Sequence, residues 1–108
     1  MRDEFPAKPK RLVDEPYLAW VRTLPCRVRE SDLDHRCQGD VQAHHRVGGG
    51  MGTKTGDRQT FPLCAGHHRA RHDMNGPFKG WDRERMREWE RNEVLATLGR
   101  RLGLDGVF

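Results

Sequence analysis

Apolar residues along the chain fall into short segments, which are separated by polar stretches that contain glycine and proline. A short helix is predicted over residues 16–23, ending before Pro25, because a residue that precedes proline avoids the helical region. Two short strands are predicted over residues 41–46 and 58–63. Pro62 cannot donate a backbone hydrogen bond, so the second strand is expected to lie at a sheet edge or to end there.

Two further helices are predicted in the second half of the chain. The first covers residues 65–74 and stops at the Asn-Gly-Pro sequence of residues 75–77. The second covers residues 83–98, with Asp82 as its N-cap and Gly99 near its end. The apolar residues of this last helix form an uneven stripe, which consists of Met86, Trp89, Val94, Leu95 and Leu98.

The order of these elements predicts a small α+β fold. Between residues 41 and 74, a strand, a glycine-rich loop, a second strand and a helix follow one another. Residues 1–15 mix prolines with basic residues and are interpreted as a flexible basic arm, and residues 26–40 as irregular chain. A length of 108 residues favours one domain, placed at residues 16–100, which leaves 101–108 as a C-terminal tail.

The amino-acid composition indicates a structural metal ion and a polyanionic partner. Only 34% of the residues are hydrophobic and 33% are charged, so the core is thin and a structural metal would help to stabilise it. The net charge of +4 suits nucleic acid or an anionic membrane surface. No segment is apolar enough to span a bilayer and no secretory signal is visible, so a cytoplasmic protein with reduced thiols is expected.

The first group of candidate metal ligands contains all three cysteines. Cys64 and His67 are separated by two residues, a spacing that lets one tight turn present both to the same ion. Cys26 and Cys37 form a second, looser pair, and thiolates select zinc over magnesium or calcium. The sequence therefore predicts a structural Cys3His zinc site. Two alternatives stay open: His35 replaces one cysteine, or three buried thiols accompany a surface histidine.

The second group of candidate ligands consists of histidines. His68 and His72 are four residues apart, so they lie on one face of the predicted helix, and His44 is the best third ligand. Three protein ligands leave positions open for water and substrate, as a catalytic metal site requires. His45 follows His44 directly, and neighbouring side chains of a strand point to opposite faces. One metal ligand and one general base is the natural division, because histidine titrates near neutral pH.

These residues lie in the segment VQAHHRVGGGMGTKTGDRQTFPLCAGHHRARH, residues 41–72. It resembles the HNH endonucleases of the His-Me finger (ββα-metal) superfamily, in particular small phage and prophage proteins with the pattern AHH…GGGMG…PLCxxHHxxxH. The resemblance covers roughly residues 16–90. It implies a ββα-metal core with flanking helices and a zinc-bound N-terminal segment, in a protein of a bacterial cell or encoded by a phage.

The resemblance also implies a role for each residue of the motif. His45 would be the general base, and an asparagine of the family braces the loop that positions this base. At the asparagine position the chain has Gln59, with Asp57 two residues earlier, and either could replace it. The implied ligands of the catalytic ion are His44, His68 and His72.

The expected reaction is metal-dependent hydrolysis of DNA, by nicking one strand to leave 5′-phosphate and 3′-hydroxyl ends. Imidazole ligands favour nickel, cobalt or zinc, whereas magnesium and manganese prefer oxygen ligands. Ligand affinity does not decide which ion works in the cell, so the candidates for the catalytic ion are Mg²⁺, Mn²⁺, Ni²⁺ and Zn²⁺. The protein could act as a monomer or a homodimer. Candidate phosphate contacts are Arg46, Lys54, Arg58, Arg69 and Arg71.

The alternative class is a non-catalytic zinc module that binds DNA or a protein, and such a module has no need of His45. Two further features have two interpretations each. The glycine-rich loop at residues 48–54 could approach a phosphate closely or be a flexible connection. Trp81 and Trp89 could stack on bases, but packing against the last helix is favoured.

Overall fold

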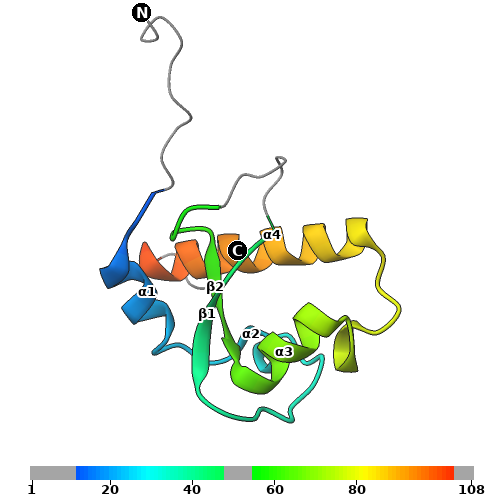
Figure 1. Cartoon of the computed structure of the whole chain (residues 1–108). Helices are drawn as coiled ribbons and strands as arrows, with labels where there is room; N and C mark the ends of the chain where they lie inside the picture. Colours follow the sequence, from blue (N-terminus) through cyan, green and yellow to red (C-terminus); the bar gives the residue numbers. More distant parts are fainter. Residues whose placement is uncertain (1–11, 48–54, 104–108) are drawn as a thin grey trace, which may run out of the picture.

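The chain has a mixed α+β fold built around a two-stranded sheet, as predicted (Figure 1). In the computed structural model, residues 12–47 and 55–103 are described. No helix in these two stretches is long and apolar enough to cross a membrane. The elements are α1 (Glu15–Val21), α2 (Arg27–Glu30), β1 (Val41–His45), β2 (Thr60–Cys64), α3 (Ala65–Asp73), the 3₁₀ helix η2 (Gly76–Phe78) and α4 (Arg83–Arg101).

Strands β1 and β2 are antiparallel, and their register pairs His44 with Phe61 and Ala43 with Pro62. Because the sheet has two strands, each is an edge strand, which is where a proline is tolerated. The predicted second strand is displaced from 58–63 to Thr60–Cys64. The reason is a turn at residues 57–59, in which the Gln59 N–H donates to the Gly56 carbonyl at 2.9 Å.

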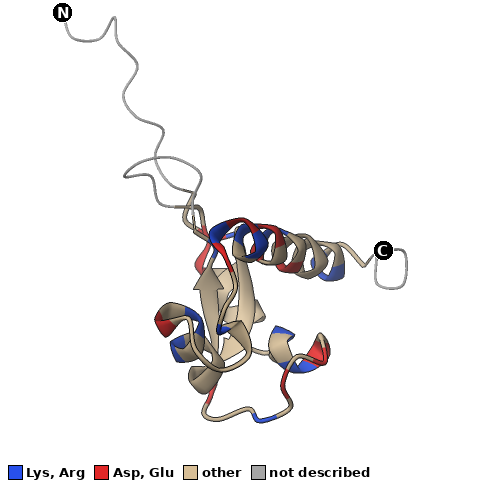
Figure 2. Cartoon of the chain, turned by 90° about the vertical axis from the view of Figure 1, so that its right-hand side faces the viewer, with Lys and Arg blue, Asp and Glu red and all other residues tan. Residues whose placement is uncertain are grey.

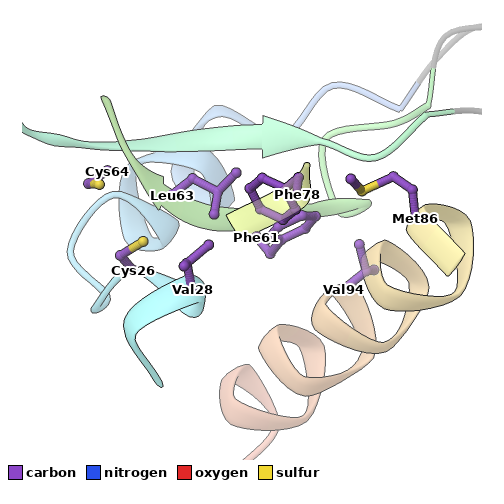
Figure 3. Packing of buried hydrophobic residues seen from close by; sticks show 8 residues of the cluster. All are labelled: Cys26, Val28, Phe61, Leu63, Cys64, Phe78, Met86 and Val94. Carbon is purple, nitrogen blue, oxygen red and sulfur yellow. The ribbon is translucent and has the colours of Figure 1, made fainter. Parts of the chain in front are cut away.

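The core lies where β2 meets the helices. All five residues of β2 are buried, and the view in Figure 1 shows α4 crossing the sheet with α3 below it. Phe61 and Phe78 are fully buried near the centre of the cluster, and Cys26 and Cys64 lie at one end of it (Figure 3). Trp89 packs edge-on against both phenylalanine rings, with centroids 5.3 and 5.1 Å away. This agrees with the packing role that the sequence favoured for the tryptophan.

The structure differs from the predicted helices at several points. Residues 26–40, expected to be irregular, contain α2, which is too short to show a periodic pattern of apolar residues. Helix α4 extends past residue 98 to Arg101, so that Gly99 lies in its last turn. Leu95, which was placed in the apolar stripe, is 55% exposed. Successive helical residues are rotated by about 100°, which carries Leu95 away from the face of Val94. Polar residues complete that buried face, namely Glu90, Glu93 and Thr97.

The start of α4 provides a stability test. The Asp82 side chain accepts a hydrogen bond from the Arg85 backbone N–H at 2.7 Å, which satisfies one of the free donors of the first turn. We expect Asp82→Ala to lower the free energy of unfolding by about 1 kcal/mol in urea denaturation. The control is Glu88→Ala, which removes the same charge from an exposed position within the helix. Equal losses in the two variants would contradict the capping role.

Candidate metal centres

The first cluster brings three sulfur atoms and one imidazole nitrogen together. Nδ1 of His67 lies 3.2 Å from Sγ of Cys64, 3.4 Å from Sγ of Cys26 and 3.8 Å from Sγ of Cys37. A tetrahedral ion with bonds of about 2.3 Å to sulfur and about 2.0 Å to nitrogen separates these atoms by about 3.5 Å. The four residues therefore lie as close together as ligands of one ion do, and they could hold a metal such as zinc.

Local structure explains how these distant residues converge. Cys64 ends β2 and caps α3, where its Sγ accepts a hydrogen bond from the His67 backbone N–H. Cys26 directly precedes α2, and Cys37 lies in the segment that leads to β1. Gly39 allows this segment to approach α3, because a Cβ at its φ of +79° would lie 2.7 Å from Cβ of Ala65.

The two alternatives to the Cys3His set do not match this geometry. His35 is exposed and pairs with Asp32, with Nε2 and Oδ1 2.8 Å apart, so it replaces none of the cysteines. His67 is only 3% exposed, so it is not a surface histidine beside three thiols.

The thiols differ in how readily they ionise. Burial raises the pKa of Cys37 to about 12, and the neighbouring Cys26 and Cys64 sulfurs add to this effect. Burial also acts on Cys64, but hydrogen bonds from the backbone N–H groups of His67 and Gln38 outweigh it and lower the pKa. A bound cation would favour the thiolate at all three positions, because it is the thiolate that binds metal.

The carboxylate of Asp34 contacts the imidazole of His67 at the ring nitrogen that does not face the sulfur atoms. Nε2 of His67 lies 3.2 Å from Oδ2 of Asp34, so the N–H of that nitrogen donates to the carboxylate and leaves Nδ1 for the sulfurs. A hydrogen bond from the Arg36 side chain, followed by one from its backbone, holds the pKa of Asp34 well below its usual range. Asp34 belongs to no sequence motif and could not be predicted as part of the site.

The second cluster brings together the three histidines that were predicted as metal ligands. The ring centroid of His44 in β1 lies 4.9 Å from that of His68 and 5.4 Å from that of His72, both in α3. One nitrogen from each ring lies within 4.8 Å of the others, so the trio could hold an ion. Burial and the neighbouring His44 and His72 lower the pKa of His68 to about 4, which keeps it in the neutral, metal-binding form.

Two residues that belong to no predicted ligand set contact this trio. Nε2 of His44 lies 2.6 Å from Oε2 of Glu90 in α4, and Nδ1 of His68 lies 2.6 Å from Oε1 of Gln42 in β1. Burial raises the pKa of Glu90, but hydrogen bonds from His44 and Arg71 outweigh it and bring the pKa to about 2. The ring nitrogens opposite these contacts, Nδ1 of His44 and Nε2 of His68, are the ones available to an ion.

His45 differs in environment from its neighbour in β1. His44 is 3% exposed, whereas the His45 side chain is 34% exposed, as strand alternation predicts. Nε2 of His45 lies 2.9 Å from Oδ1 of Asp57, a buried carboxylate that also accepts the Asp14 backbone N–H. Gln59 instead accepts a hydrogen bond from Arg46. Of the two residues left open by the sequence, Asp57 is the one that contacts His45.

The predicted phosphate contacts lie in different environments. Arg71 is 9% exposed and its Nε donates to Glu90 at 2.7 Å, so it compensates a buried charge and is not the surface cation that was expected. Arg58 pairs with Asp14, and Arg69 is an exposed partner of Asp73. Lys54 and the glycine-rich loop at 48–54 lie outside the described residues.

Together these features define a small α+β protein with two side-chain clusters that could each hold a metal ion. A family model described as "Protein of unknown function (DUF968)" matches residues 3–90, and the chain belongs to this family. The chain is also 40% identical over 75 residues to "Uncharacterized protein YdfU" of Escherichia coli (strain K12). That match covers 67% of this chain and 20% of the relative, so the chain spans a minor part of the relative's length. No solved structure matches the chain.

Proposed function

We propose that this chain is a metal-dependent HNH endonuclease that hydrolyses phosphodiester bonds in DNA, with β1, β2 and α3 as its ββα-metal core. The observation that carries the proposal is the convergence of three histidines beside a fourth, His45, that is held by a carboxylate. Three ligands leave a position open for water and substrate, whereas closed structural sites use four. The cluster of His44, His68 and His72 thus has the composition of a working site.

The chemistry can be assigned to particular nitrogen atoms. A divalent ion, when bound, supplies positive charge next to the phosphate and the leaving 3′ oxygen. His45 accepts a proton through Nδ1 from a water molecule, whose oxygen attacks phosphorus in line as the bond to the 3′ oxygen breaks. The released 3′ oxygen takes up a proton from solvent. Asp57 accepts the Nε2–H of His45, which fixes the tautomer and stabilises the imidazolium that forms. The resemblance to HNH enzymes implies 5′-phosphate and 3′-hydroxyl products.

The Cys3His cluster has a structural role in this proposal. Its four ligands form a closed set of the kind that holds structural zinc. The ion would connect the chain around α2 to the start of α3, the helix that carries His68 and His72. Zinc would therefore place two ligands of the catalytic ion.

A cleft with a volume of about 310 Å³ supports a nucleic-acid substrate. It contains three arginines and two glutamates, and Figure 2 shows basic and acidic segments alternating along α4. The Val47 backbone N–H at its edge donates to Glu90, which also contacts His44, so the cleft borders the second cluster. Arg46, Arg87 and Arg91 are proposed to contact the phosphates of DNA there.

Nicking of supercoiled plasmid tests the function. We expect the wild-type protein to nick the plasmid with Mg²⁺, Mn²⁺ or Ni²⁺, and the double variant His68→Ala/His72→Ala to be slower by on the order of 10²-fold or more. The reason is that a catalytic ion contributes several kcal/mol of stabilisation in the transition state. Rates are measured by gel densitometry of the nicked form.

The control is His35→Ala, which removes an exposed histidine that belongs to neither cluster. It should cut at the wild-type rate. Absence of nicking by the wild-type protein with every ion would contradict the proposed activity on duplex DNA. The non-catalytic zinc module would then be the better description.

A further inference from the structure

Glu90 is a buried carboxylate beside the cluster of His44, His68 and His72. It lies on α4 and is 1% exposed, and a charge at that depth is tolerated only when partners compensate it. Its Oε2 lies 2.6 Å from Nε2 of His44 and accepts from Nε of Arg71 at 2.7 Å, while Oε1 accepts from the Val47 N–H at 3.0 Å. One side chain of α4 thereby contacts β1, the residues that follow β1, and α3.

The contact with His44 determines which nitrogen of that ring is free. An ionised carboxylate only accepts hydrogen bonds, so Nε2 must carry a proton, and in the neutral ring that binds metal Nδ1 then carries none. Nδ1 is then the atom that His44 can present to an ion shared with His68 and His72. Metal-binding histidines are commonly oriented in this way by a carboxylate on the opposite ring nitrogen.

We propose that Glu90 is the positioning residue of the histidine cluster. It fixes the tautomer and ring orientation of His44, and through Arg71 it holds α3 at the correct distance from β1. Because the role concerns the ion held by these histidines, it rests on the metal-binding part of the proposed function. Glu90 lies outside residues 41–72, which carry the motif quoted above, and its role follows from its contacts.

The chain offers a matched control on the same helix. Glu93 is also buried, at 7% exposed, and its Oε1 accepts from Nε of Arg27 at 2.6 Å. It ties α4 to α2 and belongs to neither metal cluster. Replacing Glu93 therefore removes a buried ion pair without altering a metal ligand.

Glu90→Gln is the decisive variant, because an amide cannot serve all three donors. Either orientation of Gln places its NH2 group against a donor, which is the Val47 N–H in one case and His44 with Arg71 in the other. We expect the dissociation constant of Ni²⁺, measured by calorimetry on zinc-loaded protein, to rise about 10–100-fold. Glu93→Gln should change the dissociation constant of Ni²⁺ by less than about threefold, which is small compared with the effect of Glu90→Gln.

Zinc content and thermal unfolding are measured for both variants, so that a variant that has lost its fold is recognised. Should Glu90→Gln fail to fold, nitrogen NMR of the wild-type imidazoles decides. The proton of His44 is expected on Nε2, with Nδ1 shifting when Zn²⁺ or Cd²⁺ is added. A proton on Nδ1, or equal weakening of Ni²⁺ binding by the two glutamine variants, would overturn the role of Glu90.

These outcomes are separable from those of the proposed function. A wild-type protein that binds no Ni²⁺ beyond its zinc refutes the metal centre itself, and the role of Glu90 with it. Normal Ni²⁺ binding without plasmid nicking refutes the nuclease but leaves the role of Glu90 standing. Nicking together with an unchanged dissociation constant in Glu90→Gln refutes the role of Glu90 alone.

Discussion

Removal of zinc from the Cys3His cluster is expected to unfold the chain, and Cys64→Ser is expected to do the same. Structural zinc sites contribute an apparent binding free energy of about 10–16 kcal/mol, which is comparable to the whole stability of a small domain, about 5–15 kcal/mol. Cys64 also caps α3 and lies in the core cluster, so its loss acts on three kinds of contact. In circular dichroism, a zinc chelator should abolish the helical signal and the thermal unfolding transition. Both should return when zinc is restored.

The control for this prediction is again His35→Ala. His35 lies between Cys26 and Cys37 in the sequence, yet its side chain is exposed and pairs with Asp32. This variant should bind zinc and unfold at the same temperature as the wild-type protein. A metal-free wild-type protein that keeps its helical signal and its melting temperature would show that the cluster is not a structural zinc site.

His45→Ala is expected to reduce the rate of plasmid nicking by about 10²–10⁴-fold at saturating metal ion. General-base catalysis contributes an acceleration of that size, and His45 is the only histidine of β1 that is open to solvent. Asp57→Asn should reduce the rate less, because the imidazole remains but its tautomer is no longer fixed by a carboxylate. Single-turnover nicking rates across pH 6–9 measure both effects.

A measurement of Ni²⁺ binding distinguishes loss of the general base from loss of the metal site. His45→Ala should bind Ni²⁺ as tightly as the wild-type protein, because its ring is not one of the three clustered imidazoles. A variant that cuts as fast as the wild-type protein would remove His45 from the mechanism. A variant that cuts slowly and also binds Ni²⁺ weakly would instead make His45 a ligand.

Most of the elements, and the residues of both clusters, could be predicted because most of their signals are local. The spacing of Cys64 and His67 describes one turn, and the spacing of His68 and His72 describes one helix face. The pairing of the distant Cys26 and Cys37 also agreed with the structure, since few other soft ligands were present to complete the set. The assignment of DNA hydrolysis, by contrast, rests on resemblance and awaits the nicking assay.

The supporting residues could not be predicted, because each acts across a long separation in sequence. Asp34 contacts His67, and Glu90 contacts His44, through tertiary packing that no short motif records. A weak signal did exist for Glu90. It falls on the same helix face as Met86 and Val94, and a glutamate within a buried face is almost always paired. The unevenness of the apolar stripe was therefore itself informative.

Helix α3 belongs to both clusters, since His67 and His68 are adjacent along it. If both clusters hold ions as proposed, this arrangement implies an order of assembly. Zinc would first organise the start of α3, and only then would the three histidines form a pocket that a second, weaker ion can enter. Under the proposed function, a strong chelator would stop cutting and also unfold the chain. Dialysis against a mild competitor would remove only the second ion and leave zinc and the fold in place.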